Sequence, residues 1–420
     1  MVVVAAALPS IGFSGAGFLG CYHVGAAAAL EKHGWIGYTN YNRTTMQNNN
    51  TQQTSSAPLL TGVSAGSMIA ASIHAGVSPE PDGMEVVLTA ARRTRELPIS
   101  ILDALTPGYS LIDAVEGPFR MAIVKAMGGT LPSNQSRSDD HSLDSLSLYD
   151  VDPDLFRRRF PTGSLRIGLT DKRALLSSFP PPSPLSSLPA AYRYVDSYRN
   201  VEDIVASCML SSYIPGVTGP LMKDNIAEKL LGALFNTAQS EKDKQNTVKA
   251  SANDAMIRAA RQLNEMRRLG MVKDGRTHDR IEPDHNTEEH ETTHYWDGGI
   301  ADVFPTFDDG TIIVSPINGI YKNPAICPSL QEQHNEKEEG GQSLKSESLS
   351  YLIRSYIPTL PATFRHCSKS HLGLNVENAR AVKAMLLSSD DEQLYLRFKD
   401  GYDDATRFLS DRNLLRVFKG

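Results

Sequence analysis

The chain has 420 residues, of which 40% are apolar and 21% charged, and its formal net charge is −6. This composition is ordinary for a globular protein, and the mild negative charge argues against nucleic-acid binding, which requires a basic surface. No apolar run reaches the roughly 18 residues that cross a bilayer, and the four cysteines form no CxxC pair, which favours buried thiols in a reducing compartment.

The N-terminal segment predicts a strand, a glycine loop and a helix. Residues 1–8 are apolar without a basic segment, so we expect a first buried strand there rather than a signal peptide. A Gly-x-Gly-x-x-Gly sequence follows between Gly15 and Gly20, and a helix is expected over Phe18–His33. The next stretch, residues 38–56, is rich in Asn, Gln and Thr and is expected to be a surface insertion.

A second strand–turn–helix unit surrounds Ser64. A short apolar strand over Ala57–Thr61 leads into a Gly-x-Ser-x-Gly turn, in which Gly62 and Gly66 flank the serine, and a helix is expected over Ala65–Ala75. Such a turn exposes the serine hydroxyl on a tight strand-to-helix elbow. Backbone N–H groups at the start of the helix favour developing negative charge. The pattern therefore indicates a nucleophilic serine.

The glycine loop has three interpretations. A dinucleotide site expects an acidic residue about 20 positions further on, but no Asp or Glu occurs between Glu31 and Glu80. An oxyanion hole needs backbone N–H groups near the nucleophile. A plain tight turn is the third interpretation. The nearby serine elbow favours the oxyanion hole.

The middle of the chain alternates short apolar strands with helices. A strand over Leu165–Thr170 lies between helical segments around 110–127 and 201–212. This alternation favours an α/β domain with a largely parallel sheet.

Three segments are interpreted as insertions in addition to this alternation. Residues 133–154 and 332–350 are polar and are expected to be disordered or loosely ordered. Residues 223–293 have helical character instead, with an amphipathic helix over Met256–Leu269 that Gly270 would end.

A serine nucleophile needs a base. Asp297 lies between two aromatic residues and the pair Gly298-Gly299, and a desolvated carboxylate can act on a serine directly. A triad in which an acid and a histidine follow the serine could instead use His366 or His371. The residues alone leave the dyad and the triad open.

One further motif predicts different chemistry. The run from His290 to His294 has the His-Glu-x-x-His sequence of zinc metallopeptidases. That chemistry needs both histidines on one helix, yet the two intervening threonines are poor helix formers. We expect no metal site, and a zinc peptidase stays a remote alternative.

Together the glycine loop, the serine elbow and the distant Asp-Gly-Gly resemble the patatin-like phospholipase family, and longer stretches are similar to its adipose triglyceride lipase branch. These stretches are Phe13–Gly25, Tyr213–Pro215, Tyr295–Pro305, Thr311–Pro316, Ile326–Pro328, Phe398–Tyr402 and Arg407–Leu409. The resemblance covers most of the chain outside the three insertions.

The resemblance implies a three-layer α/β/α sandwich with a central, mostly parallel sheet over residues 1–320. Residues 321–420 would form a C-terminal region with helices near 376–388 and 395–412 that contributes to attachment at a lipid surface.

The resemblance also implies a Ser–Asp dyad without histidine and without a metal or organic cofactor. Ser64 would attack the ester carbonyl, Asp297 would take its proton, and the N–H groups of Gly15, Ala16 and Gly17 would form the oxyanion hole.

Expected substrates are acylglycerols or glycerophospholipids at a lipid-droplet or membrane surface. The protein would be cytoplasmic and peripherally attached, with a protein co-activator as a further candidate partner. A transacylase or a weakly active lipid-surface scaffold of the same fold is the alternative.

Overall fold

The structure is a computed structural model, and it describes the larger part of the chain. The described residues are 9–36, 59–96, 111–130, 151–177, 189–214, 218, 246–281, 295–328, 370–372, 378, 381, 384–385, 389–412 and 414. The predicted strand at 1–8 and the predicted insertions at 38–56 and 332–350 lie outside them, as do most of 133–154 and part of 223–293.

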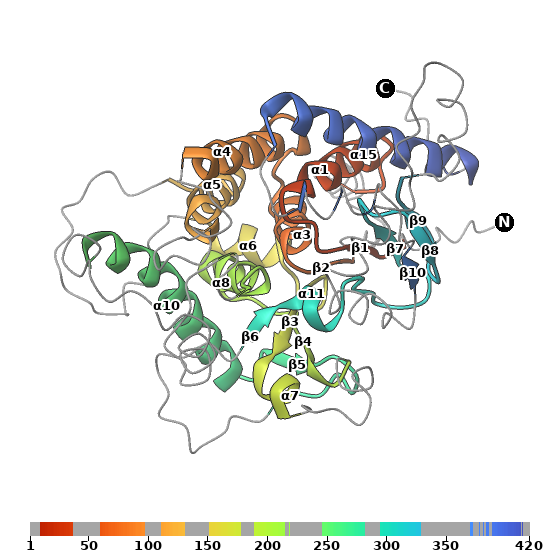
Figure 1. The fold of residues 1–420 in the computed structure, drawn as a ribbon. Coiled ribbons are helices and arrows are strands. Elements are labelled where there is room, and N and C mark those ends of the chain that lie inside the picture. Colours follow the sequence, from red (N-terminus) through yellow and green to blue (C-terminus); the bar gives the residue numbers. More distant parts are fainter. Residues whose placement is uncertain are drawn as a thin grey trace, which may run out of the picture.

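A mixed, mostly parallel sheet forms the centre of the molecule (Figure 1). Within the described residues its strands are β1 (Ile11–Phe13), β2 (Leu60–Gly62), β3 (Leu165–Asp171), β4 (Tyr192–Val195), β5 (Val272–Asp274), β6 (Tyr295–Asp297), β7 (Ile312–Val314) and β9 (Ala325–Ile326). The order is β5-β4-β3-β2-β1-β7-β9, with β6 also paired to β3. The pairs among β3, β2, β1, β7 and β9 are parallel, whereas β4, β5 and β6 join antiparallel. A small separate sheet pairs β8 (Gly319–Tyr321) with β10 (Ser370–Leu372).

Helices flank this sheet. They are α1 (Gly20–Lys32), α3 (Ala65–Ala75), α4 (Met84–Glu96), α5 (Leu111–Ala126), α6 (Pro153–Arg159), α7 (Lys172–Ser177), α8 (Val201–Ser211), α10 (Asn246–Arg268), α11 (Gly298–Ala301) and α15 (Asp391–Asp411). Short turns of tighter or wider helix are η1 (Gly17–Leu19), η2 (Pro79–Gly83) and η4 (Pro189–Ala191). The α/β fold class expected from the sequence is confirmed.

The strands nearest the centre are buried on both faces. Every residue of β1, β2 and β7 is buried, which is the burial that parallel strands covered by helices require. The helix α3 has the bounds that the sequence predicted, and it ends where Gly76 takes a left-handed conformation with φ of +88°.

The segment predicted as a third insertion is partly an integral element of the fold. The apolar face of α10 is buried, and Met256, Leu263 and Met266 belong to the main core. This face packs against α8, and β5, which follows, pairs with β4 in the central sheet. Residues 246–281 therefore belong to the body of the domain, because the apolar face of α10 has its partner inside it.

The C-terminal helix α15 lies along α1 on one side of the molecule (Figure 1). It begins four residues before the predicted 395–412, because Asp390 accepts a hydrogen bond from the N–H of Gln393 as an N-cap. The predicted helix at 376–388 lies largely outside the described residues. None of the helices described is both long and apolar enough to cross a membrane.

Candidate active site

Ser64 lies at the sharp turn between β2 and α3. Its backbone has φ of +53° and ψ of −135°, a conformation that a non-glycine residue adopts only under strain. The turn is tight because Gly66 packs against the end of β1, where a Cβ would overlap the carbonyl oxygens of Phe13 and Ser14. This geometry is that of a nucleophile elbow, in which the serine hydroxyl projects from the edge of the sheet.

The end of α8 fixes the backbone at the elbow. The N–H of Ser64 donates to the hydroxyl of Ser211 at 2.9 Å, and that hydroxyl donates to the carbonyl of Gly168 at 2.6 Å. Ser211 therefore connects the elbow to β3. Because it is far from both in sequence, the pattern of the motif gave no signal for it.

Asp297 lies near Ser64 because β2 and β6 both pair with β3. The residue Gly62 at the end of β2 pairs with Ile167 of β3, and Asp297 at the end of β6 pairs with Leu169. Since β4 occupies the other edge of β3 over the same residues, β2 and β6 share one edge and their ends face each other. The two partners, Ile167 and Leu169, are two positions apart on β3, a distance of about 7 Å at about 3.3 Å per residue.

Three hydrogen bonds fix the position of Asp297. Its N–H donates to the carbonyl of Tyr213 at 2.8 Å. The hydroxyl of Thr170 donates to its carbonyl at 2.7 Å, and the N–H of Gly299 donates to its carboxylate Oδ1 at 2.7 Å. The side chain of Ser64 also interacts with the carboxylate and lowers its pKa.

Burial makes this carboxylate a better base than an ordinary aspartate. Asp297 is 4% exposed. Burial raises its pKa from 3.8 to about 6, against the opposing effect of the hydrogen bonds from Ser64 and Gly299. At neutral pH the group is still ionised, and its proton affinity is closer to the working pH, as general-base catalysis requires.

The glycine loop, residues 15–17, lies beside the elbow. A Cβ placed on Gly15 would lie 3.6 Å from the Cβ of Ser64, and Gly17 has a φ of +51°. Within the described part of the chain, the backbone N–H groups of Gly15, Ala16 and Gly17 donate no hydrogen bond to another residue. The N–H of Ala65, as the first residue of α3, also has no partner inside its helix. These are the donors from which an oxyanion hole can be built.

The remaining predicted glycines lie around the same turn. Cβ atoms on Gly62 and Gly298 would overlap neighbouring backbone, on Gly20 would lie 3.7 Å from the Cβ of Ala65, and on Gly299 3.0 Å from Oδ1 of Asp297. All of the site residues predicted from the three motifs therefore come together in space.

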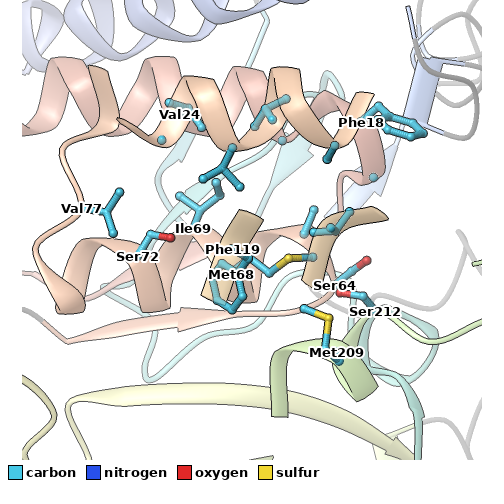
Figure 2. A pocket seen from close by; sticks show the side chains of 18 of the residues that line it. Phe18, Val24, Ser64, Met68, Ile69, Ser72, Val77, Phe119, Met209 and Ser212 are labelled. Atoms are coloured by element: carbon cyan, nitrogen blue, oxygen red, sulfur yellow. The ribbon is translucent and has the colours of Figure 1, made fainter. Parts of the chain in front are cut away.

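Ser64 opens into an apolar pocket between the helices α1, α3, α4 and α5 (Figure 2). The pocket contains about 1000 Å³ of empty space, part of it open to solvent. Ser64 lies at one end beside Ser212 and Met209, and Val77 lies at the other (Figure 2). None of the described residues that line it is charged. Apart from the motif residues Gly17, Gly20 and Ser64, the sequence predicted none of the lining residues, because they come from helices whose packing the motifs do not specify.

The histidines of the alternative triad and of the zinc motif do not lie at this site in the described part of the chain. His371 lies on β10, which pairs with β8 outside the central sheet, and His366 lies outside the described residues. The run from His290 to His294 also lies outside them. Among the described residues, Asp297 is the titratable group whose pKa the Ser64 side chain affects.

A strained serine elbow at a sheet edge, a buried carboxylate and an adjoining apolar pocket are the features of an α/β ester hydrolase that acts on apolar acyl groups. The family model for patatin-like phospholipases matches residues 12–308, so the chain belongs to this family. Membership indicates a lipid acyl-hydrolase in general. No curated protein sequence matches the chain significantly.

Proposed function

We propose that the protein hydrolyses carboxylic esters of acylglycerols or glycerophospholipids with Ser64 as nucleophile and Asp297 as base. The observation that carries the proposal is the strained elbow of Ser64 at one end of an apolar pocket, with the buried Asp297 carboxylate close enough for the Ser64 side chain to lower its pKa.

The reaction runs in two halves. The Ser64 oxygen attacks the ester carbonyl while Asp297 takes the hydroxyl proton, and N–H groups of the glycine loop and Ala65 stabilise the oxyanion. The tetrahedral intermediate expels the alcohol, which receives the proton from Asp297. Water then attacks the acyl-enzyme with Asp297 again as base, and the fatty acid leaves. With an acceptor alcohol in place of water, the same steps give a transacylase.

The pocket indicates the acyl part of the substrate. It follows α3 from Ser64 to Val77, and an 11-residue helix is about 16 Å long. An unbranched acyl chain fits such a pocket, and each buried methylene contributes about 0.8 kcal/mol to binding. We therefore propose esters of long fatty acids as substrates.

Substrates of this kind gather at lipid surfaces, so we place the protein peripherally at a lipid droplet or membrane. The similarity of the stretches Phe13–Gly25 and Tyr295–Pro305 to the adipose triglyceride lipase branch supports triacylglycerol as the substrate and a protein co-activator as a partner. The division of the chain near residue 320 into a catalytic domain and a C-terminal region is part of the same proposal.

The test compares wild type, Ser64→Ala and Asp297→Asn for fatty-acid release from emulsified triacylglycerol and from phospholipid vesicles, with and without a zinc chelator. We expect each variant to lose at least about 100-fold in activity, the lower end of what a general base contributes. The chelator should have no effect.

Matched controls make the same chemical changes away from the site. Ser197→Ala and Asp154→Asn alter residues that belong neither to the elbow nor to the pocket lining, and both should keep wild-type activity. If Asp297→Asn retained most of the activity, the base would be another group. If the chelator alone abolished activity, the serine mechanism would be wrong.

A further inference from the structure

The helix α15 lies outside the matched family domain, which ends at residue 308. It nevertheless forms the most extensive helix–helix contact in the described part of the molecule, along α1 (Figure 1). Because α1 begins directly after the glycine loop, a helix that fixes α1 also acts on the loop.

The two helices approach each other at glycines. A Cβ on Gly25 of α1 would overlap the carbonyl oxygen of Phe398, and a Cβ on Gly401 of α15 would overlap the carbonyl oxygen of Tyr22. The two backbones are therefore in direct contact at this crossing. Any larger residue at either glycine must move α15 away from α1.

Polar contacts fix the register of α15 on its neighbours. The hydroxyl of Tyr22 donates to Oδ2 of Asp404 at 2.8 Å. At the start of α15, Asp391 pairs with Arg92 at 2.8 Å and with Arg95. The ion pairs of Asp391 are partly exposed, and such pairs add little free energy. The docking of α15 therefore depends mainly on the glycine crossing and on apolar contacts.

The C-terminal chain also contacts the glycine loop itself. A Cβ on Gly17 would overlap the carbonyl oxygen of Met385. Leu394 of α15 is 1% exposed and belongs to a buried apolar cluster with Phe18, the residue that follows the loop. On its other side the loop faces Ser64. A Cβ placed on Gly15 would lie 3.6 Å from the Cβ of Ser64. The loop is therefore enclosed between the elbow and the C-terminal chain.

We propose that α15 and Met385 are a positioning element for the oxyanion hole, so that catalysis by the family domain depends on the docking of α15 on α1. The inference rests on the proposed function, because it gives the glycine loop a role in stabilising the oxyanion. In this arrangement Leu394 and Gly401 are positioning residues that act through Phe18 and α1 on residues 15–17.

The experiment uses the full chain with Leu394→Ala and Gly401→Ala. Activity is measured on p-nitrophenyl butyrate, a short soluble ester that needs neither the whole pocket nor a lipid surface. Rates are expressed per Ser64 that reacts with a phosphonate inhibitor, at a temperature well below each variant's Tm. Since removal of one oxyanion donor costs about 100-fold or more, displacement of the loop is expected to lower kcat about 10-fold, with KM changed less than about 2-fold.

The controls lie on the same helix. Leu396 is 48% exposed and Asp403 is exposed, so Leu396→Ala and Asp403→Ala should keep the wild-type kcat, and Leu394→Met should recover most of it by refilling the volume. The pH dependence of kcat should be the same in all variants, because Asp297 is unaffected.

Two results would overturn the inference. If Leu394→Ala and Gly401→Ala lowered Tm but kept the kcat of the controls, α15 would only stabilise the fold while the Ser64-dependent activity remained. If wild type showed no activity that Ser64→Ala removes, the proposed function and this inference would fail together.

Discussion

The two residues of the proposed dyad are positioned in different ways. Ser64 has a strained conformation, with φ of +53°, in a turn that its sequence neighbours Gly62 and Gly66 allow, and a single distant residue, Ser211, accepts the hydrogen bond from its N–H. Asp297 has a negative φ of −45° and takes its position from Thr170, Tyr213 and β3, which are far away in the chain.

This difference separates two sources of reactivity. The elbow exposes the Ser64 hydroxyl through its backbone geometry, and the strain of that turn lowers the free energy of unfolding. The Asp297 carboxylate becomes more basic because it is buried, and the desolvation of its charge also lowers the free energy of unfolding. We expect the free energy of unfolding to respond differently to changes at the two positions.

The largest expected effect tests the base. Because the pKa of Asp297 is raised to about 6 by burial and only the ionised carboxylate accepts the Ser64 proton, kcat/KM on a soluble ester should fall about tenfold per pH unit below pH 6. At pH 4 it should be about 100-fold below the plateau. A profile that stays flat to pH 4 would remove Asp297 from the role of base.

A second effect concerns stability at the base. Since the folded pKa is raised from 3.8 to about 6, the buried charge lowers stability as pH rises through this range, and the loss is complete above pH 6. Asp297→Asn removes the charge, so above pH 6 it should be more stable than wild type by up to about 3 kcal/mol, at about 1.4 kcal/mol per pKa unit.

Urea unfolding of both proteins between pH 4 and pH 8 measures this difference. The gap in free energy of unfolding should be near zero at pH 4 and largest at pH 8. A variant that is less stable than wild type at pH 8 would contradict the assignment of burial as the cause of the raised pKa.

The smallest expected effect concerns the strain at the elbow. Ser64→Gly relieves a positive φ that Ser64→Ala retains, and such strain is worth about 1–3 kcal/mol. Glycine loses more conformational entropy on folding than alanine, which offsets part of this gain. Ser64→Gly should therefore be about 1 kcal/mol more stable than Ser64→Ala, as measured by urea unfolding. Both variants lack the nucleophile, so the comparison isolates the backbone. Equal stabilities would show that the elbow stores no strain.

The sequence alone determined the elements that depend on neighbouring residues. The motif around Ser64 predicted a strand-to-helix turn, and α3 begins and ends where it was expected. The alternation of apolar strands and helices predicted a mostly parallel α/β sheet for the same reason, because hydrophobic periodicity is a local property.

Only the tertiary structure decided the relations between distant segments. It placed the ends of β2 and β6 at one edge of β3, enclosed the apolar pocket between four helices, and buried Asp297 deeply enough to raise its pKa. It also packed α10 into the domain and α15 against α1. Such contacts depend on how faces of separate helices and strands fit together in three dimensions, and no short motif encodes that fit.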